Sequence, residues 1–106
     1  MVDHVADVKK YTSKVDENAL NNLLKNYRLV LSKKETATVA CSQPSELDTV
    51  RNNFLKKKLG LSKSDDELNA AIKEICEKMG TSNRNKSRAT FYYLLAEKFG
   101  KLSVFS

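Results

Sequence analysis

Apolar side chains recur along this chain at intervals of three and four residues, the spacing of one face of an α-helix. The clearest stripe lies in residues 64–79, and broad stripes lie in residues 16–32 and 45–60. Residues 86–99 are apolar over more than half of a helix circumference, which predicts a central position for that helix. A thinner stripe in residues 3–11 predicts a short N-terminal helix.

Helix-ending and helix-starting residues divide these stripes. The three glycines each follow a lysine and an apolar residue, in Lys58-Leu59-Gly60, Lys78-Met79-Gly80 and Lys98-Phe99-Gly100. Glycine takes the left-handed conformation that ends many helices, and a lysine in the last turn faces the negative end of the helix dipole. Ser64 and Glu67 form a full capping box, Ser45 and Asp48 a weaker one, and Asp16 is placed to cap the second helix.

The remaining segments predict connections and a tail. Residues 33–44 contain β-branched residues without a partner strand, so a loop with a short extended piece is expected. Residues 81–85 are polar, and the apolar tail of Leu102, Val104 and Phe105 is expected to tuck onto the core. The sequence therefore predicts an all-α fold, a compact bundle of four main helices plus a shorter N-terminal helix.

Composition supports one domain that spans residues 1–106. Hydrophobic residues make up 41% of the chain and charged residues 30%, as in a globular protein. The formal charge is +6, but residues 64–80 carry five acidic and two basic side chains. A basic surplus favours anionic partners such as nucleic acid or acidic proteins. The N-terminal residues do not read as a signal peptide and no apolar run approaches the ~20 residues of a membrane span, which predicts a cytoplasmic location without membrane contact.

Two cysteines do not make a disulfide framework, and they predict a reduced thiol pair. Cys76 lies on the apolar face of residues 64–79 and is expected to act as a small core hydrophobe. Cys41 lies in the loop, where a more exposed thiol is expected. No basic cluster or neighbouring cysteine points to a redox role for Cys41.

Catalytic and metal-binding sets are poorly supplied. His4 is the single histidine and lies near the N-terminus, where an exposed side chain is expected in place of a catalytic base. One histidine and two distant thiols do not suit a zinc site, and no two glycines are close enough for a nucleotide-binding loop. Three acids at positions 65–67 suit a helix start. The prediction is a protein that is not an enzyme and uses no cofactor or metal.

Two basic segments are the candidate sites for an anion or nucleic acid. Cations at the start of a helix oppose its dipole unless an anion compensates them, which makes the second segment the better candidate. Tyr92 and Tyr93 follow it, and tyrosines at such positions pack in the core more often than they stack on a base. The first segment contains Arg51, Lys56, Lys57 and Lys58. The second contains Arg84, Lys86 and Arg88.

Two functions stay open at this point. The first is a non-enzymatic helical module that binds a protein partner or associates with itself. The alternative is a nucleic-acid or phosphate-binding module that uses the basic segments 51–58 and 84–88. Acidic residues in 64–80 argue against a helix-turn-helix reader, because phosphate would repel that helix.

Three stretches of sequence, residues 7–15, 53–61 and 86–102, resemble a family of small bacterial proteins catalogued as a domain of unknown function. The resemblance extends over residues 7–105. It implies a bacterial protein of a single domain and about this length. It implies no activity, cofactor or catalytic residue.

Overall fold

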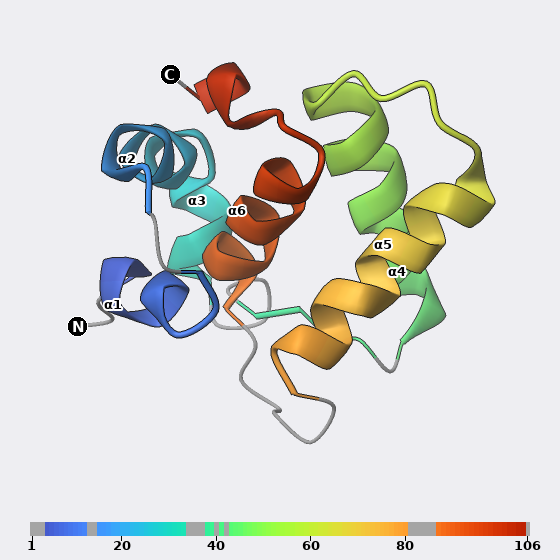
Figure 1. Ribbon diagram of the computed structural model, residues 1–106, viewed down its shortest axis with the longest axis horizontal. Helices are drawn as coiled ribbons and strands as arrows, with labels where there is room; N and C mark the ends of the chain where they lie inside the picture. The colour runs from blue at the N-terminus through green and yellow to red at the C-terminus, as the bar shows by residue number, and fades with distance from the viewer. Residues whose placement is uncertain are drawn as a thin grey trace.

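One helix, α6 (Arg88–Lys98), lies at the centre of the molecule, as the sequence predicts. Residues 88–96 of this helix are all buried, and it contacts helices on several sides. Figure 1 shows α6 between α2 on one side and α5 on the other. An apolar helix is stable in this place because neighbours cover its whole circumference.

The computed structural model describes residues 4–12, 15–33, 38, 39, 41, 43–80 and 87–105. The fold is all-α, as predicted, and the described part of the chain contains no β-strand apart from one isolated bridge between Thr38 and Ser87. The elements in chain order are α1 (His4–Lys9), α2 (Glu17–Asn26), α3 (Arg28–Ser32), α4 (Pro44–Thr49), the π-helix η1 (Val50–Lys58), α5 (Asp65–Lys78), α6 and the 3-10 helix η2 (Leu102–Phe105). None of the helices in these ranges has the length and apolar character to cross a membrane.

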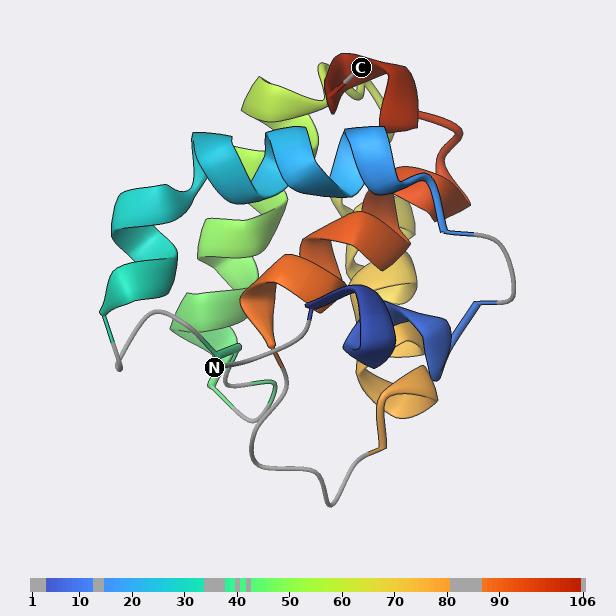
Figure 2. The same ribbon diagram turned by 90° about the vertical axis from the view of Figure 1, so that its left-hand side faces the viewer.

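The single helix predicted over residues 16–32 is wrong in one respect, because it breaks at Tyr27. Tyr27 has φ −110° and ψ 20°, outside the helical range, and α3 leaves α2 at an angle there (Figure 2). The break lets the Tyr27 ring turn into the core, where its centroid lies 5.0 Å from that of Tyr92 and 6.0 Å from that of Phe54. Aromatic packing therefore outweighs the cost of interrupting the helix.

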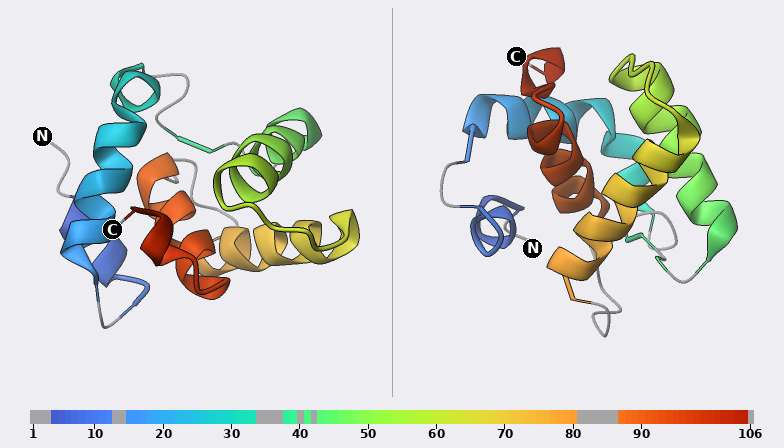
Figure 3. Two further views of the ribbon diagram at one scale, coloured as in Figure 1. Left: turned by 90° about the horizontal axis from the view of Figure 1, so that it is seen from above. Right: turned by 45° about the vertical axis from the view of Figure 1, so that its right-hand side comes forward.

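The helix predicted over residues 45–60 forms, but its start and its register differ from the prediction. It begins at Pro44 with Gln43 as its N-cap, so the weak capping box at Ser45 is not used. Proline suits the first helical position because it lacks an N–H that would go unpaired there. From Val50 the chain continues as η1, in one rod with α4 beside α5 (Figure 3).

The π-register of η1 has a reason in the apolar pattern. Val50 and Leu59 are both buried, although an α-helix would place residues nine apart about 180° around the axis. A π-helix has between four and five residues per turn, which aligns Val50, the Phe54–Leu55 pair and Leu59 on one face. The backbone N–H of Leu59 donates to the Phe54 carbonyl at 2.9 Å, the bond of this wider register.

Helix ends follow the predicted rules closely. Asp16 and Ser64 cap α2 and α5 through their side-chain oxygens, and Ser87 caps α6 in the same way. The three glycines have positive φ, at 65° for Gly60, 100° for Gly80 and 66° for Gly100. The apolar tail packs onto the core in part: Phe105 is buried and Leu102 is partly buried, whereas Val104 is exposed. The Asn22 side-chain amide donates to the Phe105 carbonyl.

Candidate functional site

Arg51, the first cation of segment 51–58, is held by the side chains around it. Its Nη1 lies 3.0 Å from Asp48 Oδ1 and donates to Asn69 Oδ1 at 3.1 Å. Its Nε lies 3.8 Å from Asp65 Oδ1, and only 15% of the side chain is exposed. The acidic start of α5 therefore partly neutralises this guanidinium.

The lysines of the same segment differ in their surroundings. Lys56 Nζ lies 2.5 Å from Asp65 Oδ1, and this hydrogen bond is the main reason that the pKa of the Asp65 carboxyl is lowered. Lys58 lies over the Phe105 ring, 5.4 Å from its centroid. Lys57 is exposed to solvent. Fewer cations of this segment are therefore available to an external anion than its sequence suggests.

Arg88, predicted as part of an anion site, points into the protein. It is 4% exposed, forms an ion pair with Glu46 and donates from Nη1 to the Tyr92 hydroxyl at 2.8 Å. Its Nη2 also donates to the Thr38 carbonyl at 3.3 Å. The guanidinium therefore joins α6 to α4 and to Thr38 in the chain before α4.

The other two cations of segment 84–88, Arg84 and Lys86, lie outside the described residues. Anion binding by this segment stays a prediction, and Arg88 contributes to it only if Arg88 leaves its internal partners. Tyr92 and Tyr93 are buried, so core packing is the role the structure gives them. The His4 side chain also lies outside the described part.

The prediction of a reduced thiol pair is wrong: Cys41 and Cys76 form a disulfide, with their Cα atoms 6.2 Å apart. Thirty-five residues separate them in sequence. Cys76 is buried as expected, and Cys41 is half-buried. Spacing in sequence gave no sign of the pairing, because it arises only when Cys41 lies beside the end of α5 in the folded chain.

A groove that the sequence did not reveal runs along the seam between α5 and the second half of α6. It consists of two adjoining hollows, which we call the α5/α6 groove. Glu74 and Lys98 line both of them. The first, of about 310 Å³, is lined by Lys63, Glu67, Ala70, Ala71, Glu74, Lys98 and Phe99. The second, of about 250 Å³, is lined by Glu74, Ile75, Lys78, Leu94, Glu97 and Lys98.

The groove has an apolar floor and a rim that carries both charges. Lys98 and Glu74 form an ion pair across the seam, and Lys63 Nζ lies 3.8 Å from Glu67 Oε2 at one end. The adjacent small side chains of Ala70 and Ala71 are the one sequence signal that could have indicated a depression here. Within the described residues, the groove included, no group of three or more His, Cys, Asp and Glu side chains could hold a metal ion.

A family model described as "Protein of unknown function (DUF2853)" matches residues 3–103. The chain belongs to this family. The match confirms the resemblance seen in residues 7–105 and covers nearly all of the sequence. No curated protein matches the chain. The family description states no activity.

Proposed function

We propose that this member of the DUF2853 family is a non-enzymatic helical module that binds one helix of a partner protein in the α5/α6 groove. The observation that carries the proposal is the pair of adjoining hollows along one seam of the bundle. Many protein partners present an amphipathic helix whose apolar side chains fill such hollows at helical spacing.

The distance between the hollows fits a helix. On α5 the first hollow is centred between Ala70 and Ala71, and the second lies near Ile75 and Lys78. At 1.5 Å of rise per residue the two centres are roughly 8 Å apart along the axis. Side chains four and seven residues apart on a partner helix are separated by about 6 and 10 Å, so either pair can reach both hollows.

The lining of the groove indicates the chemistry of the partner. The small side chain of Ala70 is exposed and lets another backbone approach closely, and the partly buried Phe99 supplies apolar area in the floor. The Glu74–Lys98 pair between the hollows offers one group of each sign to the partner. The partner helix is therefore expected to carry two apolar anchors with a charged or polar residue between them.

The surroundings of the cations favour this function over the alternative of nucleic-acid binding. Arg51 and Lys56 pair with Asp65, and Arg88 pairs with Glu46. Each of these carboxylates offsets part of the positive charge that its cation would offer to a phosphate. A cytoplasmic location is part of the same proposal.

The test is selection of helical peptides against the full chain from a displayed library, followed by affinity measurement. Ala70→Arg places a long charged side chain in the first hollow, and Ala6→Arg on the exposed surface of α1 is the matched control. We expect selected peptides with apolar residues at i and i+4 or i+7, at least tenfold weaker binding to Ala70→Arg, and unchanged binding to Ala6→Arg.

Two results would contradict the proposal. The first is that the selected peptides bind Ala70→Arg as tightly as the original chain. The second is that the chain selects no helical peptide but binds duplex DNA at ~50 mM salt. The logarithm of its binding constant would then fall with the logarithm of the salt concentration, with a slope near −0.9 per phosphate contact. Sedimentation equilibrium on the chain alone distinguishes self-association, which would replace the partner helix with a second copy.

A further inference from the structure

We infer that the Cys41–Cys76 disulfide is a site of reversible thiol–disulfide exchange, and that its redox state controls how firmly Thr38, Val39 and Cys41 are held against α5 and α6. The reaction partner is a small dithiol or the corresponding disulfide. This inference does not depend on the α5/α6 groove. It rests on where the bond lies and on what it holds in place.

The bond links two parts of the fold that share no helix. Cys41 precedes α4, whereas Cys76 belongs to the last turns of α5. Figure 1 shows the chain before α4 passing close to the end of α5. Breaking the bond therefore removes the covalent cross-link between Cys41 and α5, and leaves only the backbone path through α4 and η1.

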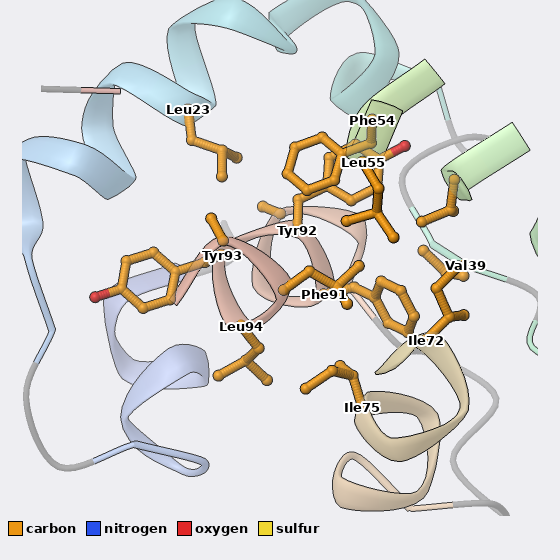
Figure 4. Close-up of a cluster of buried hydrophobic side chains, with 14 of the residues drawn as sticks. Leu23, Val39, Phe54, Leu55, Ile72, Ile75, Phe91, Tyr92, Tyr93 and Leu94 are labelled. Atoms are coloured by element: carbon orange, nitrogen blue, oxygen red, sulfur yellow. The ribbon is translucent and has the colours of Figure 1, made fainter. Parts of the chain in front are cut away.

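The residues beside Cys41 make contacts that matter for the core. Val39 is 3% exposed and lies in the same part of the buried cluster as Ile72 (Figure 4). Thr38 pairs with Ser87, at the start of α6, and its carbonyl accepts from Arg88 Nη2 at 3.3 Å. The disulfide thus supports a backbone acceptor for the buried guanidinium.

The two sulfurs differ in access. Cys41 is half-buried on an irregular stretch of chain, whereas Cys76 is 7% exposed and faces the apolar core. An attacking thiolate therefore reaches Cys41 Sγ more readily. A free sulfur at Cys76 lies near the carbonyl end of α5, where burial and the helix dipole both disfavour a thiolate. Reduction is accordingly expected to be slow in the folded protein.

The exchange balances as two displacements. One thiolate of the dithiol attacks Cys41 Sγ, the S–S bond breaks, and Cys76 leaves and takes up a proton. The free thiolate of the dithiol then attacks the other sulfur of the same dithiol, which is bonded to Cys41 in the mixed disulfide. Cys41 leaves and is protonated in turn. The protein gains two hydrogen atoms, and the dithiol becomes a cyclic disulfide.

Reduction leaves Thr38 and Val39 held by noncovalent contacts alone. Local opening of such a segment needs less free energy than global unfolding, so opening becomes more frequent without loss of the fold. The opening removes one acceptor from Arg88, which keeps its contacts with Glu46 and Tyr92. Permanent disulfides are uncommon in the reducing cytosol. Reversible exchange would make the Cys41–Cys76 bond compatible with the cytoplasmic location proposed above.

The experiment compares the full chain after treatment with oxidised glutathione and after treatment with dithiothreitol. Mass spectrometry should show an intramolecular bond, because the chain should become about 2 Da heavier on reduction. Reduction should be at least tenfold slower in the folded protein than in denaturant. Hydrogen exchange should rise at least tenfold in peptides that contain Val39 and Cys41, while peptides from α2 stay unchanged. The double variant Cys41→Ser/Cys76→Ala is the control, and its exchange should not respond to dithiothreitol.

Single variants test the predicted point of attack. Cys41 in Cys76→Ala should react with iodoacetamide at least tenfold faster than Cys76 in Cys41→Ser. Three results would overturn the inference: two free thiols after oxidation, a disulfide between two molecules, or equal hydrogen exchange in both redox states. Equal labelling rates of the two single variants would overturn the assignment of Cys41 as the attacked sulfur.

Discussion

Phe54 and Tyr92 stack face to face, with ring centroids 3.9 Å apart and an angle of 13° between the planes. Phe54 reaches this position from the π-helix, and Tyr92 from the central α6. Tyr27 meets the same stack edge-on at the break between α2 and α3. The Phe54 and Tyr92 rings lie side by side in Figure 4. The cluster links three segments of the chain, and it explains why two predicted helices depart from regular α-geometry at Tyr27 and around Phe54.

Phe54→Ala should lower the free energy of unfolding by about 3–5 kcal/mol, because it removes a fully buried ring and leaves a cavity beside Tyr92. Urea unfolding followed by circular dichroism measures the change. Phe99→Ala is the matched control, since Phe99 is only partly buried and its truncation should cost clearly less. Equal losses for the two variants would contradict the central role of the Phe54–Tyr92 stack.

Glu46→Gln should destabilise the fold by about 3–5 kcal/mol, because it leaves the buried Arg88 guanidinium without its carboxylate partner. The control is Asp48→Asn, which removes a carboxylate that is 58% exposed and pairs with Arg51. Such a surface pair is worth at most about 1 kcal/mol. Chemical denaturation of both variants gives the comparison, and a loss under 1 kcal/mol for Glu46→Gln would show that Arg88 does not depend on the pair.

The fold could be predicted from local rules to a large extent. Ser64, Asp16 and the glycines act on backbone groups within a few residues, so their effects are visible in the sequence. The break at Tyr27 could not be foreseen in this way, since it depends on rings that arrive from distant segments. The register of η1 left one trace: buried residues at positions 50, 54, 55 and 59 do not fit a spacing of 3.6.

The candidate site was harder to predict because its determinants are contacts between elements. Arg88 looks like a surface cation beside Ser87 in the sequence, and only the approach of α4 places Glu46 against it. The Cys41–Cys76 bond likewise depends on where Cys41 packs against α5. Charge counts identified the acidic character of residues 64–80 correctly, but not that Asp65 is paired with Lys56.

Gly100→Ala should cost about 1–2 kcal/mol through the backbone alone. Gly100 has φ 66°, and a Cβ placed on it would meet no atom within 4 Å, so steric contact with neighbours adds nothing. Gly100→Asn should cost less, because asparagine tolerates the left-handed region better. Thermal unfolding of the two variants checks the order, and equal stability of Gly100→Ala and the original chain would show that α6 does not need this ending.

Stability should fall above pH 10 because buried tyrosines must stay protonated in the folded state. Burial raises the pKa of Tyr27 above its ordinary value near 10, with the neighbouring Tyr92 adding to the effect, and burial also raises the pKa of Tyr92. Above pH 10 the unfolded chain releases these protons while the native protein keeps them. The stability that the protonated tyrosines contribute is therefore complete below pH 10, and it is lost as the pH rises toward the raised pKa values.

Tyr27→Phe isolates this effect from the titration of surface lysines, which both proteins share. Between pH 10 and 11 the original chain should lose roughly 0.5–1 kcal/mol more than the variant, less than the full ~1.4 kcal/mol for one proton because the Tyr27 ring is only partly buried. Urea unfolding at pH 8, 9, 10 and 11 measures both curves. Parallel curves across this range would mean that the Tyr27 hydroxyl ionises as easily in the folded protein as in the unfolded chain, and that the ring is not held in the aromatic cluster.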